Sequence, residues 1–166
     1  MTLMLHASAS PIEYAALRDL PVPEATHSHV PLAHHRLVDL VKSVPGMFGH
    51  IVDEEHYGAT PDGSNFFGAI SLKSSYGNYT DVCGLRNSHI KQFPVGIAYG
   101  SRVFVCDNLA FVSDHVIRTK HTAKLKERLP GLVNTLLEPL ADQRGAQHRK
   151  LLTYQNTRSL LPQPTT

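Results

Sequence analysis

The chain has no tryptophan, only two cysteines, and no apolar run near the roughly 20 residues that a membrane-spanning helix needs. Charged residues make up 18% and aromatic residues 7% of the 166 residues, and the formal net charge is +2. These values exclude a collagen, a coiled coil and a fully disordered chain. They also lie far from the strong basic excess of a protein that wraps nucleic acid. The length fits one domain with tails.

Targeting and redox signals are equally sparse. The stretch Met1–His6 is short and lacks a basic start, so we expect no signal peptide and a cytoplasmic protein. Cys83 and Cys106 are 23 positions apart and form no C-x-x-C pair. We expect two reduced, buried thiols, with a structural disulfide or a catalytic thiol as alternatives.

Motifs for catalysis and metal binding are missing. The chain has no G-x-S-x-G, no Walker A loop, no G-x-G-x-x-G and no H-E-x-x-H. Its 11 histidines include His34-His35 and His27-x-His29, but none has zinc-site spacing. The single acidic run is Asp53-Glu54-Glu55, in which strand alternation would separate Glu54 from the other two. We therefore predict no metal, no cofactor and no catalytic residue, and a binding protein rather than a hydrolase or nuclease.

Charge is divided unevenly along the chain. Residues 1–114 contain seven Lys/Arg and eleven Asp/Glu, whereas residues 115–166 contain nine and three. A basic C-terminal third indicates an anionic partner, of which nucleic acid is the commonest. The alternative is a solvated helix rich in lysine and arginine.

The hydrophobic pattern predicts an α+β fold. Residues 1–30 read as an irregular segment that holds a short helix-like piece near Ile12–Leu17. A helix follows Pro31 and ends at Pro45-Gly46, since Leu37, Leu40, Val41 and Val44 recur on one face. Apolar alternation and turn residues then predict antiparallel strands. These strands are His50–Tyr57, Asn65–Lys73, Thr80–Leu85, Phe93–Tyr99, Arg102–Asn108 and His115–Lys120.

Two features define the predicted architecture. Gly100-Ser101 predicts a type II′ central hairpin in which Tyr99 opposes Arg102. After Thr122, a plausible N-cap, a leucine stripe predicts C-terminal helices, with Pro130 opening the second and another helical piece near Ala146–Asn156. We thus expect an N-terminal helix, an antiparallel β-meander with a central hairpin and a C-terminal helical layer. The single domain spans 31–156, and residues 157–166 form a disordered tail.

Polar residues gather at the expected ends of apolar elements. Donors are dense in Gly84–His89, which we expect to be a recognition loop. The alternative is that its side chains satisfy loop backbone groups. Asp107-Asn108 ends a strand, and Arg118–Thr122 leads into a helix N-terminus that favours anions. The candidate nucleic-acid-binding residues are Arg86, Asn87, His89, Asn108, Lys120, His121, Lys124, Lys126 and Arg128.

Five blocks carry a family resemblance. They are GLRNSH (84–89), FPVG (93–96), VFVCDNLAF (103–111), KHT (120–122) and LPGLV (129–133). In this order they resemble the phage/plasmid-like family called domain of unknown function 932, over about Leu32–Asn156. Family members carry aspartate after RNSH, where this chain has Ile90, and they continue further, so the chain resembles a shortened member. The resemblance implies a protein of a prophage, plasmid or other mobile element in a bacterial host.

Together these observations predict a nucleic-acid-binding accessory protein of a mobile element, in recombination or DNA protection, with single-stranded DNA favoured over duplex. Tyr76, Tyr79 or Phe93 would supply stacking surfaces. The alternative is a protein-binding effector that inhibits a host enzyme or defence system. We expect Arg86, His89, Asn108 and Lys120 to meet in one shallow groove. The leucine stripe also predicts a homo-oligomer, and no membrane partner is expected.

Overall fold

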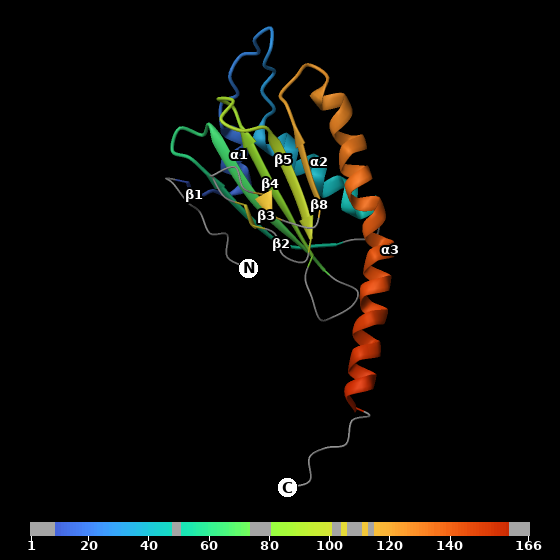
Figure 1. Cartoon of the computed structure of the whole chain (residues 1–166). Helices are drawn as coiled ribbons and strands as arrows, with labels where there is room; N and C mark the ends of the chain where they lie inside the picture. Colours follow the sequence, from blue (N-terminus) through green and yellow to red (C-terminus); the bar gives the residue numbers. More distant parts are fainter. Residues whose placement is uncertain are drawn as a thin grey trace.

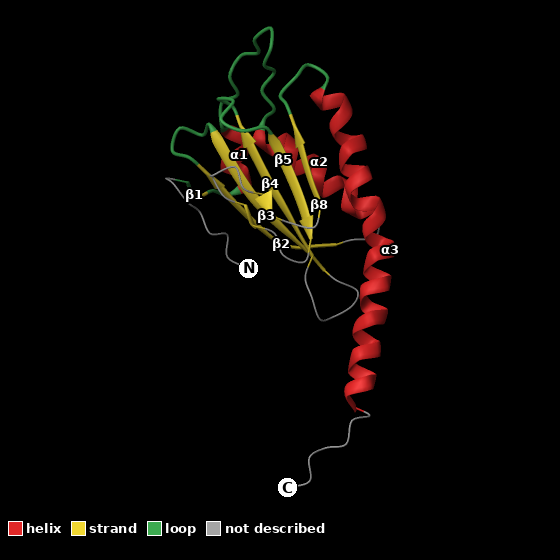
Figure 2. Cartoon of the chain, viewed as in Figure 1, coloured by secondary structure: helices red, strands yellow, loops and turns green. Residues whose placement is uncertain are grey.

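The computed structural model describes residues 9–47, 51–73, 81–100, 104–105, 111–112 and 115–159. Its centre is a six-stranded, fully antiparallel sheet in the order β1-β2-β3-β4-β5-β8, so the fold is α+β (Figures 1 and 2). The strands are β1 (Ser10–Pro11), β2 (Ile51–Ala59), β3 (Asn65–Lys73), β4 (Asp81–Ser88), β5 (Val95–Gly100) and β8 (His115–Thr119).

The β2–β3 turn follows the predicted turn chemistry. Gly63 has φ 71°, a conformation that glycine adopts without strain, and its N–H donates to the Thr60 carbonyl at 2.8 Å. The carboxylate of Asp62 accepts from the Ser64 N–H at 3.1 Å. β3 therefore begins at Asn65, as predicted. Near the other end of β2 the register shifts between Val52 and Glu54, which marks a β-bulge.

The predicted central hairpin is wrong. β5 pairs with β8, so that Tyr99 opposes His115 rather than Arg102. The chain leaves the sheet after β5 and forms a separate two-stranded pair, β6 (Phe104–Val105) with β7 (Phe111–Val112). This pair contacts β3, β4 and β5. Small residues of the central strands, such as Gly84, Gly96 and Ala98, leave room on a sheet face for a second layer.

Three helices contribute to one core with the sheet. They are α1 (Tyr14–Asp19), α2 (His34–Met47) and α3 (Leu125–Ser159). The buried apolar cluster joins Leu17 of α1, Leu37 of α2 and Leu129 of α3 to strand residues such as Ile97. In Figure 1, α2 lies behind the sheet, whereas α3 runs along the β8 edge and continues beyond the ends of the strands.

Several predicted boundaries differ from the structure; α2, for example, continues through Pro45 and Gly46 to Met47. The segment before residue 30 joins the domain, because Pro11 pairs with Gly58 and Leu17 is buried. The predicted helix break at Pro130 is wrong, since α3 is continuous from Leu125 to Ser159. Leu129 and Val133 are buried on either side of Pro130, and this packing offsets the one helical hydrogen bond that proline cannot donate. Of the expected disordered tail 157–166, residues 157–159 belong to α3 instead, and the rest lies outside the described residues.

The leucine stripe covers the chain's own core in the first half of α3. Leu125, Leu129, Val133 and Leu136 are all buried there. Further along the helix, Leu152 is exposed. Burial of the first four residues within one chain means that the stripe does not by itself require a second subunit, and the homo-oligomer stays a prediction.

Candidate functional site: a buried histidine cluster beside a basic pocket

The first three residues of the RNSH sequence lie in a strand rather than in the predicted loop, and His89 follows in a turn. Arg86, Asn87 and Ser88 are the last three residues of β4, and they are almost fully buried. Strand alternation sends Asn87 toward the helices, where it contacts Leu32, and sends Arg86 to the opposite face. The loop expectation failed because a strand that is covered on both faces can hold polar residues at its end.

Asn87 joins three segments of the chain. Its side-chain amide donates to the Leu32 carbonyl at 2.7 Å and to Nδ1 of His34 at 2.9 Å. Its carbonyl oxygen accepts from Nε2 of His121 at 2.7 Å. Because the Leu32 carbonyl can only accept, the orientation of the amide is fixed. The β4 strand end, the start of α2 and the segment before α3 thus share one polar centre.

Four histidines surround this amide. His34 and His89 stack, with ring centroids 3.9 Å apart, and His29 and His121 have centroids 5.0 Å apart. All four are buried, with exposed fractions of 2 to 6%. His89 donates from Nε2 to the Leu32 carbonyl at 2.9 Å, and His29 donates to the His89 carbonyl at 3.2 Å. We call these four residues and Asn87 the histidine cluster.

The contacts of the cluster fit neutral imidazoles. Nε2 of His34 donates to the Gly63 carbonyl at 2.8 Å while its Nδ1 accepts from Asn87, which is the neutral tautomer. Burial, and then the neighbouring His89, lowers the pKa of His34 to about 3. Burial, and then His29 and His89, lowers the pKa of His121 to about 4. Burial also lowers the pKa of His89.

Arg86 does not reach the surface. Its exposed fraction is 1%, and its guanidinium lies 5.2 Å from the centre of the Phe93 ring. Phe93 is itself buried and contacts Phe67 at a centroid distance of 5.6 Å. In this structure, therefore, Arg86 is not presented to a phosphate and the faces of Phe93 are not open to a base. Asn108, Tyr76 and Tyr79 lie outside the described residues.

A pocket of about 360 Å³ opens next to the histidine cluster. It is lined by Ser28, His29, Lys91, Gln92, Phe93, Pro94, Lys120, His121 and Thr122. We call it the loop pocket, because it lies where the segment before α2, the β4–β5 loop and the β8–α3 connection meet. Lys91 has φ 60°, a left-handed conformation that is costly for a residue with a side chain.

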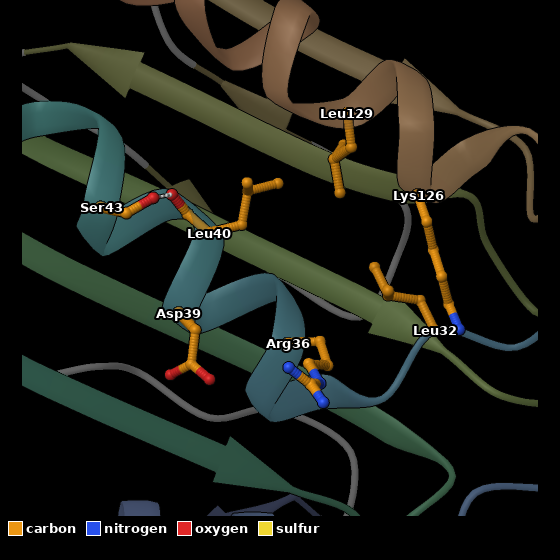
Figure 3. A pocket seen from close by; sticks show the side chains of 7 residues that line it. All are labelled: Leu32, Arg36, Asp39, Leu40, Ser43, Lys126 and Leu129. Atoms are coloured by element: carbon orange, nitrogen blue, oxygen red, sulfur yellow. Dashed lines mark hydrogen bonds between the residues drawn. The ribbon is translucent and has the colours of Figure 1, made fainter.

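A second pocket, of about 510 Å³, lies between α2 and α3 and is shown in Figure 3. Leu40 and Leu129 point into it from the two helices, and Arg36 and Lys126 bring cationic side chains to the end near Leu32. The carboxylate of Asp39, another lining residue, accepts a hydrogen bond from the Tyr14 hydroxyl. We call this the interhelical groove.

The candidate residues near α3 divide by exposure. Lys120, Lys124, Lys126 and Arg128 are exposed, whereas His121 is 5% exposed and belongs to the cluster. Four residues were expected in one groove. Lys120 lines the loop pocket, and His89 contacts His29, which also lines it. Arg86 packs against the buried ring of Phe93, and Asn108 lies outside the described residues.

Sequence reasoning missed His29, His34, Lys91 and Arg36. The abundance of histidine was the available signal for the first two. Spacing alone could not select them, because their partners are 60 and 53 residues away in the chain.

Among the residues that the structure describes, no three His, Cys, Asp or Glu side chains are placed to hold a metal ion. No helix in the described part of the chain has the length and apolar character to cross a membrane. No family model, curated protein or solved structure matches the chain. The family resemblance of the five blocks therefore stays a prediction.

Proposed function

We propose that this protein binds the phosphate backbone of nucleic acid through the cations around the start of α3. The observation that carries the proposal is the meeting of cations from distant segments. Lys91 and Lys120 line the loop pocket, while Arg36 and Lys126 line the interhelical groove. Cations grouped at pockets that border one helix start are typical of a surface for a polyanion.

The local charge supports this reading. Residues 118–128 contain five Lys or Arg and one acidic residue. Lys124 and Arg128 are exposed and lie one helical turn apart, so they extend the basic surface along α3. Lysines of this kind position a phosphate backbone and carry little sequence information. We therefore expect weak sequence preference, and single-stranded DNA remains the favoured partner.

The biological setting is also part of the proposal. An accessory protein of a phage or plasmid, in the cytoplasm of a bacterial host, fits the resemblance and a role in recombination or DNA protection. We also propose the finer architecture that is expected from the sequence, in which an N-terminal helix and a C-terminal helical layer flank the β-meander.

Salt-dependent binding tests the function. Labelled single-stranded and duplex DNA are titrated at two or more salt concentrations, and a Lys124→Gln/Lys126→Gln variant is compared with an Arg149→Gln/Lys150→Gln control. All four residues are exposed, and each variant removes two positive charges; Lys124 directly precedes α3, and the other three residues lie on it. The first variant should bind about tenfold more weakly and reduce the salt slope by about two, because each lysine neutralises about one phosphate. Equal losses in both variants, or no binding at 50 mM salt, would overturn the proposal.

One observation favours the alternative of a protein-binding effector. α3 continues beyond the strands in Figure 1, and Leu152 on this projecting part is 44% exposed. This apolar side chain can pack against a partner protein but cannot bind a phosphate. Affinity capture from host lysate with wild-type protein and a Leu152→Asp variant tests this. A stoichiometric protein retained by the first and lost by the second supports the alternative, and nucleic acid alone counts against it.

A further inference from the structure

The loop pocket combines features of a small anion site. Its volume of about 360 Å³ falls within the ~300–1,000 Å³ range of small-molecule pockets. Lys91 and Lys120 reach it from different connections, one after β4 and one after β8. The lining residues that the structure describes include no Asp or Glu, so none of them supplies a carboxylate that competes for the two ammonium groups.

The buried wall of the pocket adds fixed polar groups. His29 and His121 line it with exposed fractions of 6% and 5%. Each ring commits Nε2 to an inward hydrogen bond, to the His89 carbonyl and to the Asn87 amide oxygen respectively. These contacts hold both rings in place, so the wall is built before any ligand enters. Ser28, Gln92 and Thr122 add neutral donors at the rim, and Phe93 and Pro94 form an apolar side.

We propose that the loop pocket binds a phosphomonoester, held by Lys91 and Lys120 against the wall formed by His29 and His121. A phosphomonoester carries about −1.5 to −2 charge at pH 7, whereas an internal phosphodiester carries one negative charge. Two lysines that line one pocket favour the group with the higher charge. The apolar side, to which Pro94 contributes in front of the buried Phe93, suits the sugar attached to that phosphate.

The source of the phosphomonoester is either the phosphorylated end of a DNA strand or a free nucleotide. A DNA strand end is the source if the protein binds nucleic acid, and for that source the inference rests on the proposed function. The chemistry of the pocket does not depend on that function. The experiment must therefore separate the two.

Three probes do so: a single-stranded oligonucleotide with a 5′-phosphate, the same oligonucleotide with a 5′-hydroxyl, and thymidine 5′-monophosphate. We expect the 5′-phosphate to tighten binding at least about fivefold, as one charge-assisted contact does. We also expect the mononucleotide to compete for this gain. Equal affinity of the two oligonucleotides, without binding of the mononucleotide, overturns the pocket inference and leaves the basic surface standing. Binding of the mononucleotide without either oligonucleotide supports the pocket and overturns the nucleic-acid function.

Variants assign the effect to the pocket. Lys91→Asn keeps a residue that tolerates positive φ, and Lys120→Gln keeps most of the side-chain length. Both positions are exposed, so the fold should survive, and a thermal melt checks this. Each variant should abolish the fivefold preference for the 5′-phosphate, whereas Lys150→Gln should retain it. A preference that persists in both pocket variants overturns the assignment.

Discussion

The imidazole rings of His34 and His89 are nearly parallel, with planes 5° apart and centroids separated by 3.9 Å. Two protonated rings at this distance would repel each other in a buried site. The pair is therefore compatible with the folded state only while the rings remain largely neutral, which is how the hydrogen bonds of His34 hold it.

The stability of the fold should fall as the pH is lowered below about 6.5, where free imidazoles take up protons. In the folded chain the pKa of His34 is about 3 and that of His121 about 4. Between the folded pKa and about 6.5, the unfolded state binds more protons than the folded state. Each histidine therefore lowers the free energy of unfolding by up to about 1.4 kcal/mol for each unit by which the pH falls. Once the pH falls below the folded pKa, the contribution is fully lost.

Urea unfolding between pH 8 and 5 measures the effect above the range in which most carboxylates titrate. A His27→Gln variant, which removes an exposed histidine outside the cluster, should show the same profile. A free energy of unfolding that stays constant from pH 7 to 5 would contradict the neutral cluster.

Asn87 should be far more costly to remove than an exposed asparagine. Asn87→Ala leaves His34 Nδ1 and His121 Nε2 without their partner in a buried site, which should cost about 2–4 kcal/mol of folding free energy. Asn134→Ala, on the exposed face of α3, should change it by about 0.5 kcal/mol or less. Chemical denaturation of both variants tests the difference, and similar midpoints would argue against a polar hub.

Two glycine-to-alanine changes should have opposite signs. A Cβ at Gly68 would lie 3.0 Å from Phe66 Cζ and 3.1 Å from Tyr57 Cδ1, so the alanine must displace core rings at a cost of about 1–3 kcal/mol. A Cβ at Gly131 in α3 meets nothing within 4 Å. Gly131→Ala should therefore stabilise by about 0.5–1 kcal/mol through helix propensity. Thermal melts compare them, and destabilisation by both changes would show that α3 is not a regular helix at this position.

Cys83 should be inert in the folded protein. Its exposed fraction is 2%, and burial raises the pKa of the thiol to about 12. Because the thiolate is the reactive form, a thiol reagent at pH 8 should react with Cys83 only after unfolding. A Cys106→Ser background isolates this residue, and denaturant supplies the full-reactivity control. Rapid labelling without denaturant would show that the sheet opens at β4.

The sequence predicts those parts of the fold that depend on interactions between residues close together in the chain. The strand Asn65–Lys73 is predicted correctly because the turn before it is defined by local hydrogen bonds, from the Gly63 N–H to the Thr60 carbonyl and from the Ser64 N–H to the Asp62 carboxylate. The pairing of β5 failed for the opposite reason. Gly100-Ser101 has good hairpin chemistry, but β8 arrives from outside that turn and occupies the edge of β5.

The site was predictable only in part for the same reason. Lys120, Lys124, Lys126 and Arg128 stood out as a run of charge in the sequence, and they are exposed. Asn87 was singled out as a surface donor, but its role depends on His34 and Leu32, which are distant in the chain. Burial on both faces of β4 turned an expected recognition motif into an internal polar network.

The acidic run Asp53-Glu54-Glu55 lies in β2 near the margin of the sheet, where it disfavours pairing with a strand of another molecule. β1 covers only the last two residues of β2, Gly58 and Ala59, so the rest of β2 is an outer strand that could accept a strand from another molecule. A bulge between Val52 and Glu54 distorts that margin, and consecutive carboxylates would repel an identical copy. β1 itself ends in Pro11, which has no N–H to offer, and the β8 margin is contacted by α3. Both margins of the described sheet therefore carry features that disfavour edge-to-edge pairing with another copy.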